Sequence, residues 1–401
     1  MTASIRGGTV TPTPYTPAGE TEGAGPTARL AALAAEHAPA AEADRRLTDE
    51  VAAALLEAGF ARHFVPAEHG GRGSTFALLL RETEEVARGC AATAWCGMIY
   101  ALSSRMAALL PGPTRRNLWG RGPDVPIAAA LNPAGAARPV PGGWRLTGRW
   151  GFLSGVDFAH WSLLCAPAER GGEERELRYF LVPREQYEVH DTWLTLGLRG
   201  TGGNTVQAED LFVPEDRSYP QATLLRGLRT PSAPEFLRVP LLGAHAPAFV
   251  APALGAARAA VGGWADEVAQ HAGNGSLVAA PAAAQATVAR ATGELDAAGL
   301  LLERAAAATD TGRLSRPRAA RNARDASLAA SLVRDAVERV FHAGGSRVQA
   351  QSHPLQRTWR DVQAATSHAA LNSERSSGVY ARYALAEGGL RMPDGTADEA
   401  S

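Results

Sequence analysis

Residues 143–164 read GWRLTGRWGFLSGVDFAHWSLL, and the alternation in this stretch decides the fold class of the middle of the chain. Short alternating runs recur between about Val125 and Arg238 and are separated by the turn sequences PGG, RGG and TGGN. Alternation of apolar and polar residues with glycine-rich breaks is typical of antiparallel β-strands. We therefore predict a small β domain over residues 125–238.

The regions on either side of this β domain have a helical period instead. From Thr27 to Leu110, apolar residues recur at steps of three and four, with Thr48 placed to cap a helix start and Gly59 to end one, and further helices are expected over 75–88 and 93–110. After Val239, four long amphipathic segments are expected at 243–272, 281–309, 316–343 and 355–386, a pattern that predicts a bundle. The predicted fold class is α+β, mainly α, with a disordered tail (1–26), a helical domain (27–124), the β domain (125–238), a helical bundle (239–388) and a polar tail (389–401).

Composition excludes several classes of function. The chain has 401 residues, and 40 basic residues balance 41 acidic ones, so a nucleic acid or an anionic membrane surface is not an expected partner. All the basic residues are arginine, which excludes Schiff-base chemistry on a lysine and the lysine of a P-loop. The amino-terminal stretch lacks the pattern of a signal peptide, and the longest apolar run, residues 239–257, is interrupted by three prolines. These features predict a cytoplasmic protein without a membrane span.

Generic cofactor and metal motifs are also missing. Three cysteines, Cys90, Cys96 and Cys165, form no CxxC pair, and reduced buried thiols are expected. Histidine and cysteine show no spacing typical of a metal site, so no metal is predicted. The glycine-rich stretch LGLRGTGGNT, residues 196–205, does not match GxGxxG and is not followed by a helical pattern, so a nicotinamide site of the Rossmann type is not supported.

Four segments carry a resemblance to a known family: residues 57–95, 143–164, 191–217 and 342–372. In this order they resemble the two-component flavin-dependent monooxygenases of the acyl-CoA dehydrogenase fold, which include aromatic and indole hydroxylases and amino-sugar nitrososynthases. The resemblance extends over about residues 27–386. It implies an N-terminal helical domain, a central antiparallel β-barrel and a C-terminal four-helix bundle, assembled as a homotetramer or a dimer.

The resemblance also implies an activity. Reduced FAD, or reduced FMN as the alternative, would come from a separate NAD(P)H:flavin reductase and react with O₂ to give a C4a-hydroperoxyflavin. The implied reaction is hydroxylation of an indole-like or phenol-like small molecule in secondary metabolism, and N-oxygenation of an amine by the same machinery stays open. An acyl-CoA dehydrogenase is less favoured because the segment VQAATSHAALN after Asp361 lacks that family's Glu-Gly-Thr pattern. A non-catalytic relative is the remaining alternative.

Flavin contacts are expected from three places. The resemblance places Ser154 near the flavin N5 atom, at the end of a strand whose residues Trp150, Phe152, Leu153 and Gly155 would lie against the ring edge. Trp193, with Arg199 and Thr201, is expected on the face that meets the ring or the phosphates. Backbone groups of Gly344, Gly345 and Ser346 would receive a flavin phosphate from a neighbouring subunit. The competing interpretations are a strand-end serine, a core tryptophan and a simple helix-ending loop.

His368 is the expected proton-transfer group near the substrate, and with Ser154 it forms the predicted catalytic pair. Arg360 and Asp361 are expected to form a structural ion pair within the bundle. Where several aromatic hydroxylases of the family carry a second histidine, this chain reads MIYALSSRM, which predicts a substrate of different polarity. The same helix would wall the substrate with Trp95, Met98, Ile99, Leu102 and Ser103, or these residues serve packing alone.

Overall fold

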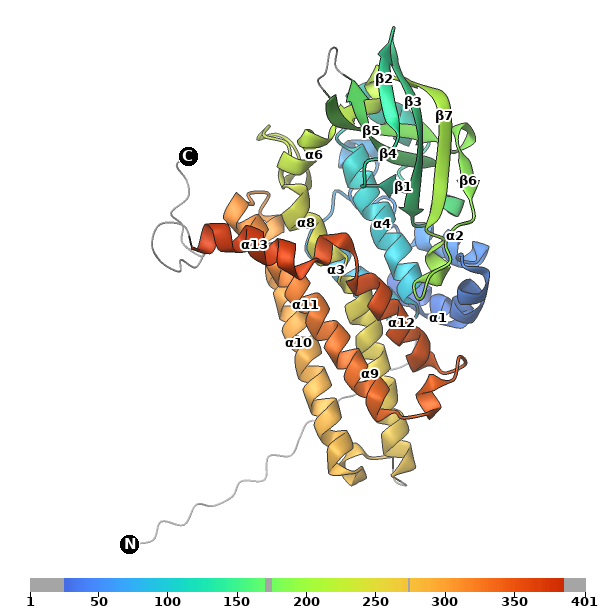
Figure 1. Cartoon of the computed structure of the whole chain (residues 1–401), viewed down its shortest axis with the longest axis vertical. Coiled ribbons are helices and arrows are strands. Elements are labelled where there is room, and N and C mark those ends of the chain that lie inside the picture. Colours follow the sequence, from blue (N-terminus) through green and yellow to red (C-terminus); the bar gives the residue numbers. More distant parts are fainter. Residues whose placement is uncertain (1–24, 170–174, 273–274, 386–401) are drawn as a thin grey trace.

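The computed structural model describes residues 25–169, 175–272 and 275–385. Within these residues the chain forms a helical region, then an eight-stranded sheet, and then a bundle of long helices (Figure 1). The predicted polar tail (389–401), the RGG turn and all of the predicted disordered tail except Gly25 and Pro26 lie outside the described residues. This order of helices, sheet and bundle agrees with the fold class predicted from the sequence.

The N-terminal helices pack around one central member of the group. The expected cap at Thr48 is confirmed, because its hydroxyl accepts the N–H of Val51 at 3.4 Å. Every residue of α4 is buried except Ile99, so this helix forms the centre of the region. The helices are α1 (Pro26–Asp44), α2 (Asp49–Glu57), α3 (Phe76–Ala87), α4 (Ala91–Ala107) and α5 (Gly112–Trp119).

The strands of the middle region form one sheet in the order β6-β7-β3-β2-β4-β5-β8, with β1 paired to β4. Most pairs are antiparallel as expected, but β1 and β2 each run parallel to β4. The sheet has a core of its own that includes Trp144, Trp150, Phe180 and Val206. Its strands are β1 (Ile127–Ala130), β2 (Ala136–Val140), β3 (Gly143–Leu153), β4 (Trp161–Glu169), β5 (Arg175–Pro183), β6 (Glu188–His190), β7 (Asn204–Pro214) and β8 (Ser218–Pro220).

The C-terminal region contains the expected long helices, with two differences. The segment expected as one helix over 243–272 is divided into helices at Leu241–Ala248 and Ala251–His271. The segment expected as a single helix over 355–386 is broken, because His368 and Asn372 both use their side chains to accept backbone N–H groups and so start new elements. The helices are α6 (Gln221–Arg226), α7 (Glu235–Arg238), α8 (Leu241–Ala248), α9 (Ala251–His271), α10 (Ala282–Asp310), α11 (Arg316–Ala343), α12 (Pro354–Thr366) and α13 (Ser373–Ala384), and the short 3₁₀ helix η8 (Ala369–Leu371) lies between the last two.

Helix α4 lies between the sheet and the bundle (Figure 1), and an ion pair between Arg360 and Glu42 joins α12 to α1. The bundle is tied to the N-terminal region by Asp310, whose carboxylate accepts the N–H groups of Phe76 and Ala77 at the start of α3, at 2.7 and 3.0 Å. The three cysteines are unpaired and buried, as expected. In the described part of the chain, no helix is long and apolar enough to span a membrane.

Candidate active site

Four residues from distant parts of the chain meet where β3, α4 and the bundle converge. The indole N–H of Trp95 in α4 donates to the Ser154 hydroxyl, just beyond β3, at 3.1 Å. The Trp95 ring lies 5.6 Å from the ring of Phe249, which joins α8 to α9. The His368 ring stacks on Phe249 with a centroid distance of 4.0 Å and an angle of 25°. The two predicted catalytic residues, Ser154 and His368, therefore belong to one cluster that Trp95 and Phe249 connect.

His368 is held in a neutral form in this cluster. Its Nδ1 accepts the N–H of Ala370 at 3.2 Å, so the neutral ring carries its proton on Nε2. Burial among aromatic rings lowers the pKa of His368 to about 4, because the charged form loses solvation there. At neutral pH this histidine is consequently an uncharged donor through Nε2, whereas the sequence predicted a base.

The chain beyond β3 is shaped by a close contact with α4. Phe152 has a left-handed backbone (φ 66°) and a side chain that is 71% exposed, which is unusual for a phenylalanine at the end of a buried strand. At Gly155 (φ 72°) a Cβ atom would lie 2.6 Å from the Tyr100 hydroxyl, which donates to the Gly155 carbonyl at 2.7 Å. Only glycine fits there. Tyr100 thus sets the position of Ser154, and the sequence reasoning did not identify this role.

A second loop, residues 191–203, completes this exposed corner. The Trp193 ring meets the Phe152 ring edge to face at 5.6 Å, which brings together two aromatic residues that were predicted as flavin contacts. Thr201 is buried, and its carbonyl accepts the Gly155 N–H at 2.7 Å. Arg199 is partly exposed, with its Nε 3.7 Å from a carboxylate oxygen of Glu42. Five predicted residues, Phe152, Gly155, Trp193, Arg199 and Thr201, therefore lie in or beside one corner.

Two of the predicted flavin contacts point elsewhere. Trp150 is 1% exposed, and its indole N–H donates to the Cys165 carbonyl at 2.7 Å inside the core of the sheet. Leu153 is also fully buried in that core. The side chains of Trp150 and Leu153 therefore pack the sheet beneath the corner, and their expected contact with the flavin through backbone groups stays a prediction. The pairing of β3 with β7 shifts register between Trp150 and Leu153, and this irregularity turns Phe152 outward.

The predicted substrate residues of α4 lie on adjoining faces of the helix. Trp95, Ile99 and Leu102 follow the i, i+4, i+7 spacing of a single face, and Met98 and Ser103 flank it. Ile99 is the only residue of α4 with partial exposure, and it lies one turn from Trp95. Solvent therefore reaches this face of α4 directly beside the aromatic cluster.

The predicted phosphate loop, residues 344–346, lies far from this cluster. It precedes α12, whereas His368 follows α12, and a helix of 13 residues is about 20 Å long. Gly345 and Ser346 are exposed at that remote end. Within one chain the loop therefore does not adjoin the cluster, and its contact with a flavin phosphate stays a prediction.

Arg360 and Asp361 do not form the ion pair that was expected. Arg360 pairs with Glu42 of α1, with 2.5 Å between Nη1 and Oε1. Asp361 is 5% exposed, and its Oδ1 accepts the N–H of Leu198 at 2.7 Å. Burial raises the pKa of Asp361 to about 7, and the nearby Glu42 adds to the increase, while Arg357, Arg360 and the Leu198 N–H oppose it. The neighbours of Asp361 in space, not its neighbour in sequence, determine its role.

Asp361→Asn is expected to unfold at a higher urea concentration than the wild type at about pH 8.5. The native state raises the pKa of Asp361 from 3.8 to about 7, so its contribution to stability is present at low pH and is lost as the pH rises between these values. Each pKa unit corresponds to about 1.4 kcal/mol. The rise from 3.8 to about 7 therefore makes the loss in the free energy of unfolding on the order of 4 kcal/mol. Urea titrations across this range should show the two proteins converging as the pH falls toward 4, and a constant difference would contradict the assignment.

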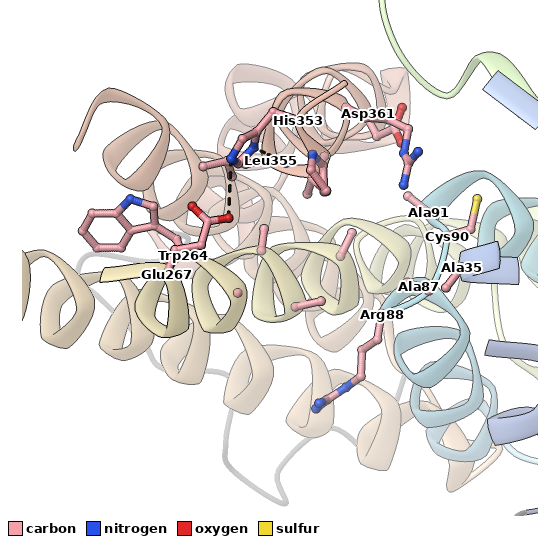
Figure 2. A pocket seen from close by; sticks show the side chains of 18 residues that line it. Ala35, Ala87, Arg88, Cys90, Ala91, Trp264, Glu267, His353, Leu355 and Asp361 are labelled. Atoms are coloured by element: carbon pink, nitrogen blue, oxygen red, sulfur yellow. Dashed lines mark hydrogen bonds and ion pairs between the residues drawn. The ribbon is translucent and has the colours of Figure 1, made fainter. Parts of the chain in front are cut away.

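A pocket of about 380 Å³ lies between α9 and α12 beside the turn that leads into α4 (Figure 2). None of the predicted catalytic, flavin or substrate residues lines it. His353 and Glu267 form a pair at one end of the pocket, with 3.4 Å between Nε2 and Oε1. Asp361 lies at the other end (Figure 2). The described residues contain no group of three or more side chains placed to hold a metal ion.

Comparisons with known proteins agree with this architecture. The family models of the acyl-CoA dehydrogenase N-terminal and C-terminal domains match residues 27–110 and 248–373. HsaA, the oxygenase subunit of a flavin-dependent monooxygenase from Rhodococcus jostii (strain RHA1), is 32% identical over 375 residues, or 90% of this chain and 96% of HsaA. The oxygenase component of an FADH₂-dependent resorcinol hydroxylase from Rhizobium sp. (strain MTP-10005) is 30% identical, with coverages of 87% and 90%. The crystal structure of 3-HSA hydroxylase from Rhodococcus sp. RHA1 matches with a TM-score of 0.85 and 29% identity, covering 92% of this chain and 97% of that one.

The helical domain, the sheet and the bundle thus form an acyl-CoA dehydrogenase fold. In this chain, the four residues of the cluster around Trp95 include a serine and a histidine but no carboxylate. Within that fold, the chain belongs to the two-component flavin-dependent monooxygenases and is an oxygenase component. This confirms the resemblance seen in the sequence.

Proposed function

We propose that this oxygenase hydroxylates an aromatic or heteroaromatic small molecule of the phenol or indole type. The observation that carries the proposal is the cluster of Ser154, Trp95, Phe249 and His368, because its two aromatic rings suit a flat substrate and its serine and histidine offer hydrogen bonds. A resorcinol hydroxylase among the relatives supports an aromatic substrate. Secondary metabolism stays part of the proposal as the setting of the reaction.

The corner beside this cluster fits a flavin ring. The exposed ring of Phe152 and the half-buried ring of Trp193 offer a surface for a planar conjugated ring. We assign the ring to Phe152, Trp193 and Ser154 and the flavin's polar groups to Arg199 and Thr201. When bound, the reduced flavin supplies the electrons that activate O₂.

The source and the type of the flavin follow from the same assignment. A separate NAD(P)H:flavin reductase would supply reduced FAD, and the FADH₂-dependent relative favours FAD over FMN. Gly344, Gly345 and Ser346 would reach the flavin of a neighbouring subunit in a homotetramer or a dimer, because they lie at the opposite end of α12 from His368.

His368 would act on the substrate as a hydrogen-bond donor. Its Nε2–H can stabilise the negative oxygen of a phenolate, and the phenolate is the more electron-rich form of a phenol. Helix α4 is the helix in which aromatic hydroxylases of this family were expected to carry a second histidine. Its Tyr100 and Ser104 hydroxyls donate to the carbonyls of Gly155 and Ala61. His368 is therefore, with Ser154, a polar group that this arrangement leaves for the substrate.

The proposal is tested by anaerobic titration of the protein with reduced FAD and then reduced FMN, followed by mixing with O₂ and candidate substrates. Resorcinol, indole-3-acetate and p-hydroxyphenylacetate form a first panel, because relatives of this chain are named for these compounds. Binding of reduced FAD and formation of a hydroxylated product from a panel member are the expected results. Failure to bind either reduced flavin would overturn the proposal.

Trp193→Leu is expected to raise the dissociation constant for reduced FAD by about tenfold, since loss of an aromatic contact costs on the order of 1 kcal/mol. Phe212→Ala is a matched control, because Phe212 is an exposed aromatic residue of the same sheet that pairs with Arg145 at a different part of β3. Its affinity for reduced FAD should equal that of the wild type. Equal affinities for all three proteins would remove Trp193 from the flavin site.

A further inference from the structure

The backbone of one residue in the 191–203 loop, Leu198, connects two of the predicted flavin residues with each other. Leu198 is 4% exposed and has a left-handed backbone, with φ 52°. Its carbonyl accepts three hydrogen bonds: from the Trp193 indole at 2.9 Å, and from the Thr201 hydroxyl and backbone N–H at 2.8 and 3.1 Å. A leucine adopts this backbone only where its surroundings hold it there. The positions of Trp193 and Thr201 therefore depend on the Leu198 peptide.

The other side of the Leu198 residue is held by the bundle. Its N–H donates to Asp361 Oδ1 at 2.7 Å, across 163 positions of sequence. Next to it, Gly197 touches α12 so closely that a Cβ atom would lie 2.1 Å from the Arg360 carbonyl oxygen. Arg360 also donates to the Leu196 carbonyl at 2.9 Å. Three consecutive residues of the loop are thus pressed against the backbone and side chains of α12.

Burial of the Asp361 carboxyl group is energetically unfavourable at this position. In the described part of the chain, the Leu198 N–H is the one hydrogen bond found for its carboxyl group, and no cation lies within ion-pair distance of it. The charged groups around it are Glu42 on α1, and Arg357 and Arg360 on α12. A buried carboxyl group without an ion pair costs stability, so the hydrogen bond to the Leu198 N–H is the contact through which Asp361 acts on its surroundings.

Helix α12 also leads directly to the cluster around Trp95. Asp361 and His368 are seven residues apart, and the helix ends at Thr366, two residues before His368. The hydrogen bond from Asp361 to Leu198 therefore joins the loop that carries Trp193 to the element that carries His368. Any displacement of the loop relative to α12 would change the distance between the two groups.

We propose that Asp361 is a positioning residue for the flavin site: its carboxyl group fixes the Leu198 peptide and thereby sets Trp193 and Thr201 in place relative to His368. This inference rests on the proposed flavin role of Trp193 and Thr201. It assigns to Asp361 a task in cofactor binding that is exerted through another residue, without contact between Asp361 and the cofactor.

The test compares Asp361→Ala with Asp361→Asn by hydrogen exchange and flavin binding. In the flavin-free protein, amide exchange of residues 193–203 should become at least tenfold faster in Asp361→Ala, because the Leu198 N–H loses its acceptor. The dissociation constant for reduced FAD should rise by about tenfold in the same variant. Asp361→Asn keeps an oxygen that can accept the N–H, so both measurements should stay within about twofold of the wild type.

Two further variants separate positioning from general stability. Glu294→Gln removes another buried carboxylate of the bundle, one that pairs with Arg290 and Arg339 and not with the loop. It should lower the melting temperature and leave loop exchange and flavin affinity unchanged. Gly197→Ala should reproduce the effects of Asp361→Ala, because the added methyl group collides with the Arg360 carbonyl and moves the loop off α12. This variant keeps the test decisive if Asp361→Ala does not fold.

Wild-type exchange rates in the loop of Asp361→Ala, or of Gly197→Ala in its place, would overturn the proposal. So would faster exchange combined with an unchanged affinity for reduced FAD, because the loop would then be free without any consequence for the flavin. If the wild type itself does not bind reduced flavin, the proposed function fails instead, and the exchange rates still decide whether Asp361 holds the loop.

Discussion

Replacing His368 with alanine is expected to slow product formation by about 100-fold and to leave the affinity for reduced FAD unchanged. The imidazole stacks on Phe249 and offers its Nε2–H beside Trp95, so its loss removes the polar contact for the substrate but not the proposed flavin corner. Single-turnover experiments with reduced FAD, O₂ and a substrate from the panel measure the rate of product formation. Anaerobic titration measures the affinity.

His368→Asn is the informative companion variant. An asparagine amide can donate a hydrogen bond but cannot take up a proton, so it should retain more activity than alanine if His368 acts as a donor. Because the pKa of His368 is lowered to about 4, its ring is charged only below that pH, and the rate should show no step from this group between about pH 5.5 and 8. A wild-type step in that range that disappears in His368→Asn would establish proton transfer by His368 and refute the donor role.

Ser154→Ala is expected to lower the rate of product formation by about 100-fold, with most of the reduced flavin consumed to release hydrogen peroxide. Trp95 donates to the Ser154 oxygen, so the serine's own hydrogen is free to point toward the flavin corner and stabilise negative charge that develops there. Simultaneous assays of product and hydrogen peroxide give the fraction of flavin that is used productively. An unchanged fraction would exclude this role for Ser154.

A matched control separates this chemistry from packing. Ser104 is a second buried serine of comparable environment, and its hydroxyl donates to the Ala61 carbonyl at 2.7 Å, away from the cluster. Ser104→Ala should lose about 1 to 3 kcal/mol of stability, as Ser154→Ala should, because each change leaves a buried polar partner without its hydrogen bond. Only Ser154→Ala should alter the fraction of flavin that ends in product.

Features that depend on near neighbours in sequence were predicted well. The helix expected over 316–343 has those bounds in the structure, and Thr48 caps α2 as expected. Helical periodicity and caps involve contacts within about four positions of the chain, so the sequence displays them directly. The break at His368 was missed for a related reason: its side chain competes with the helix for a backbone N–H, while its neighbours keep a helical pattern.

Strand alternation was less reliable at the end of β3. Alternation places Trp150 and Phe152 on one face, and both were predicted to meet the flavin. The structure turns them in opposite directions, because the register shift after Trp150 and the left-handed backbone at Phe152 interrupt the pleat. Such an irregularity is set by the partner strand β7 and by Tyr100 beneath Gly155, neither of which the local sequence reveals.

The sequence by itself determined the order of the three regions, the family and the identity of Ser154 and His368 as candidates, since periodicity and motif order are properties of the linear chain. Only the tertiary structure decided that Phe249 and Trp95 join these two residues and that Asp361 binds Leu198 instead of pairing with Arg360. It also decided the burial of His368, which lowers the pKa of this side chain to about 4. Burial and hydrogen bonding between segments far apart in the sequence control pKa values and side-chain roles, and these interactions exist only after the chain has folded.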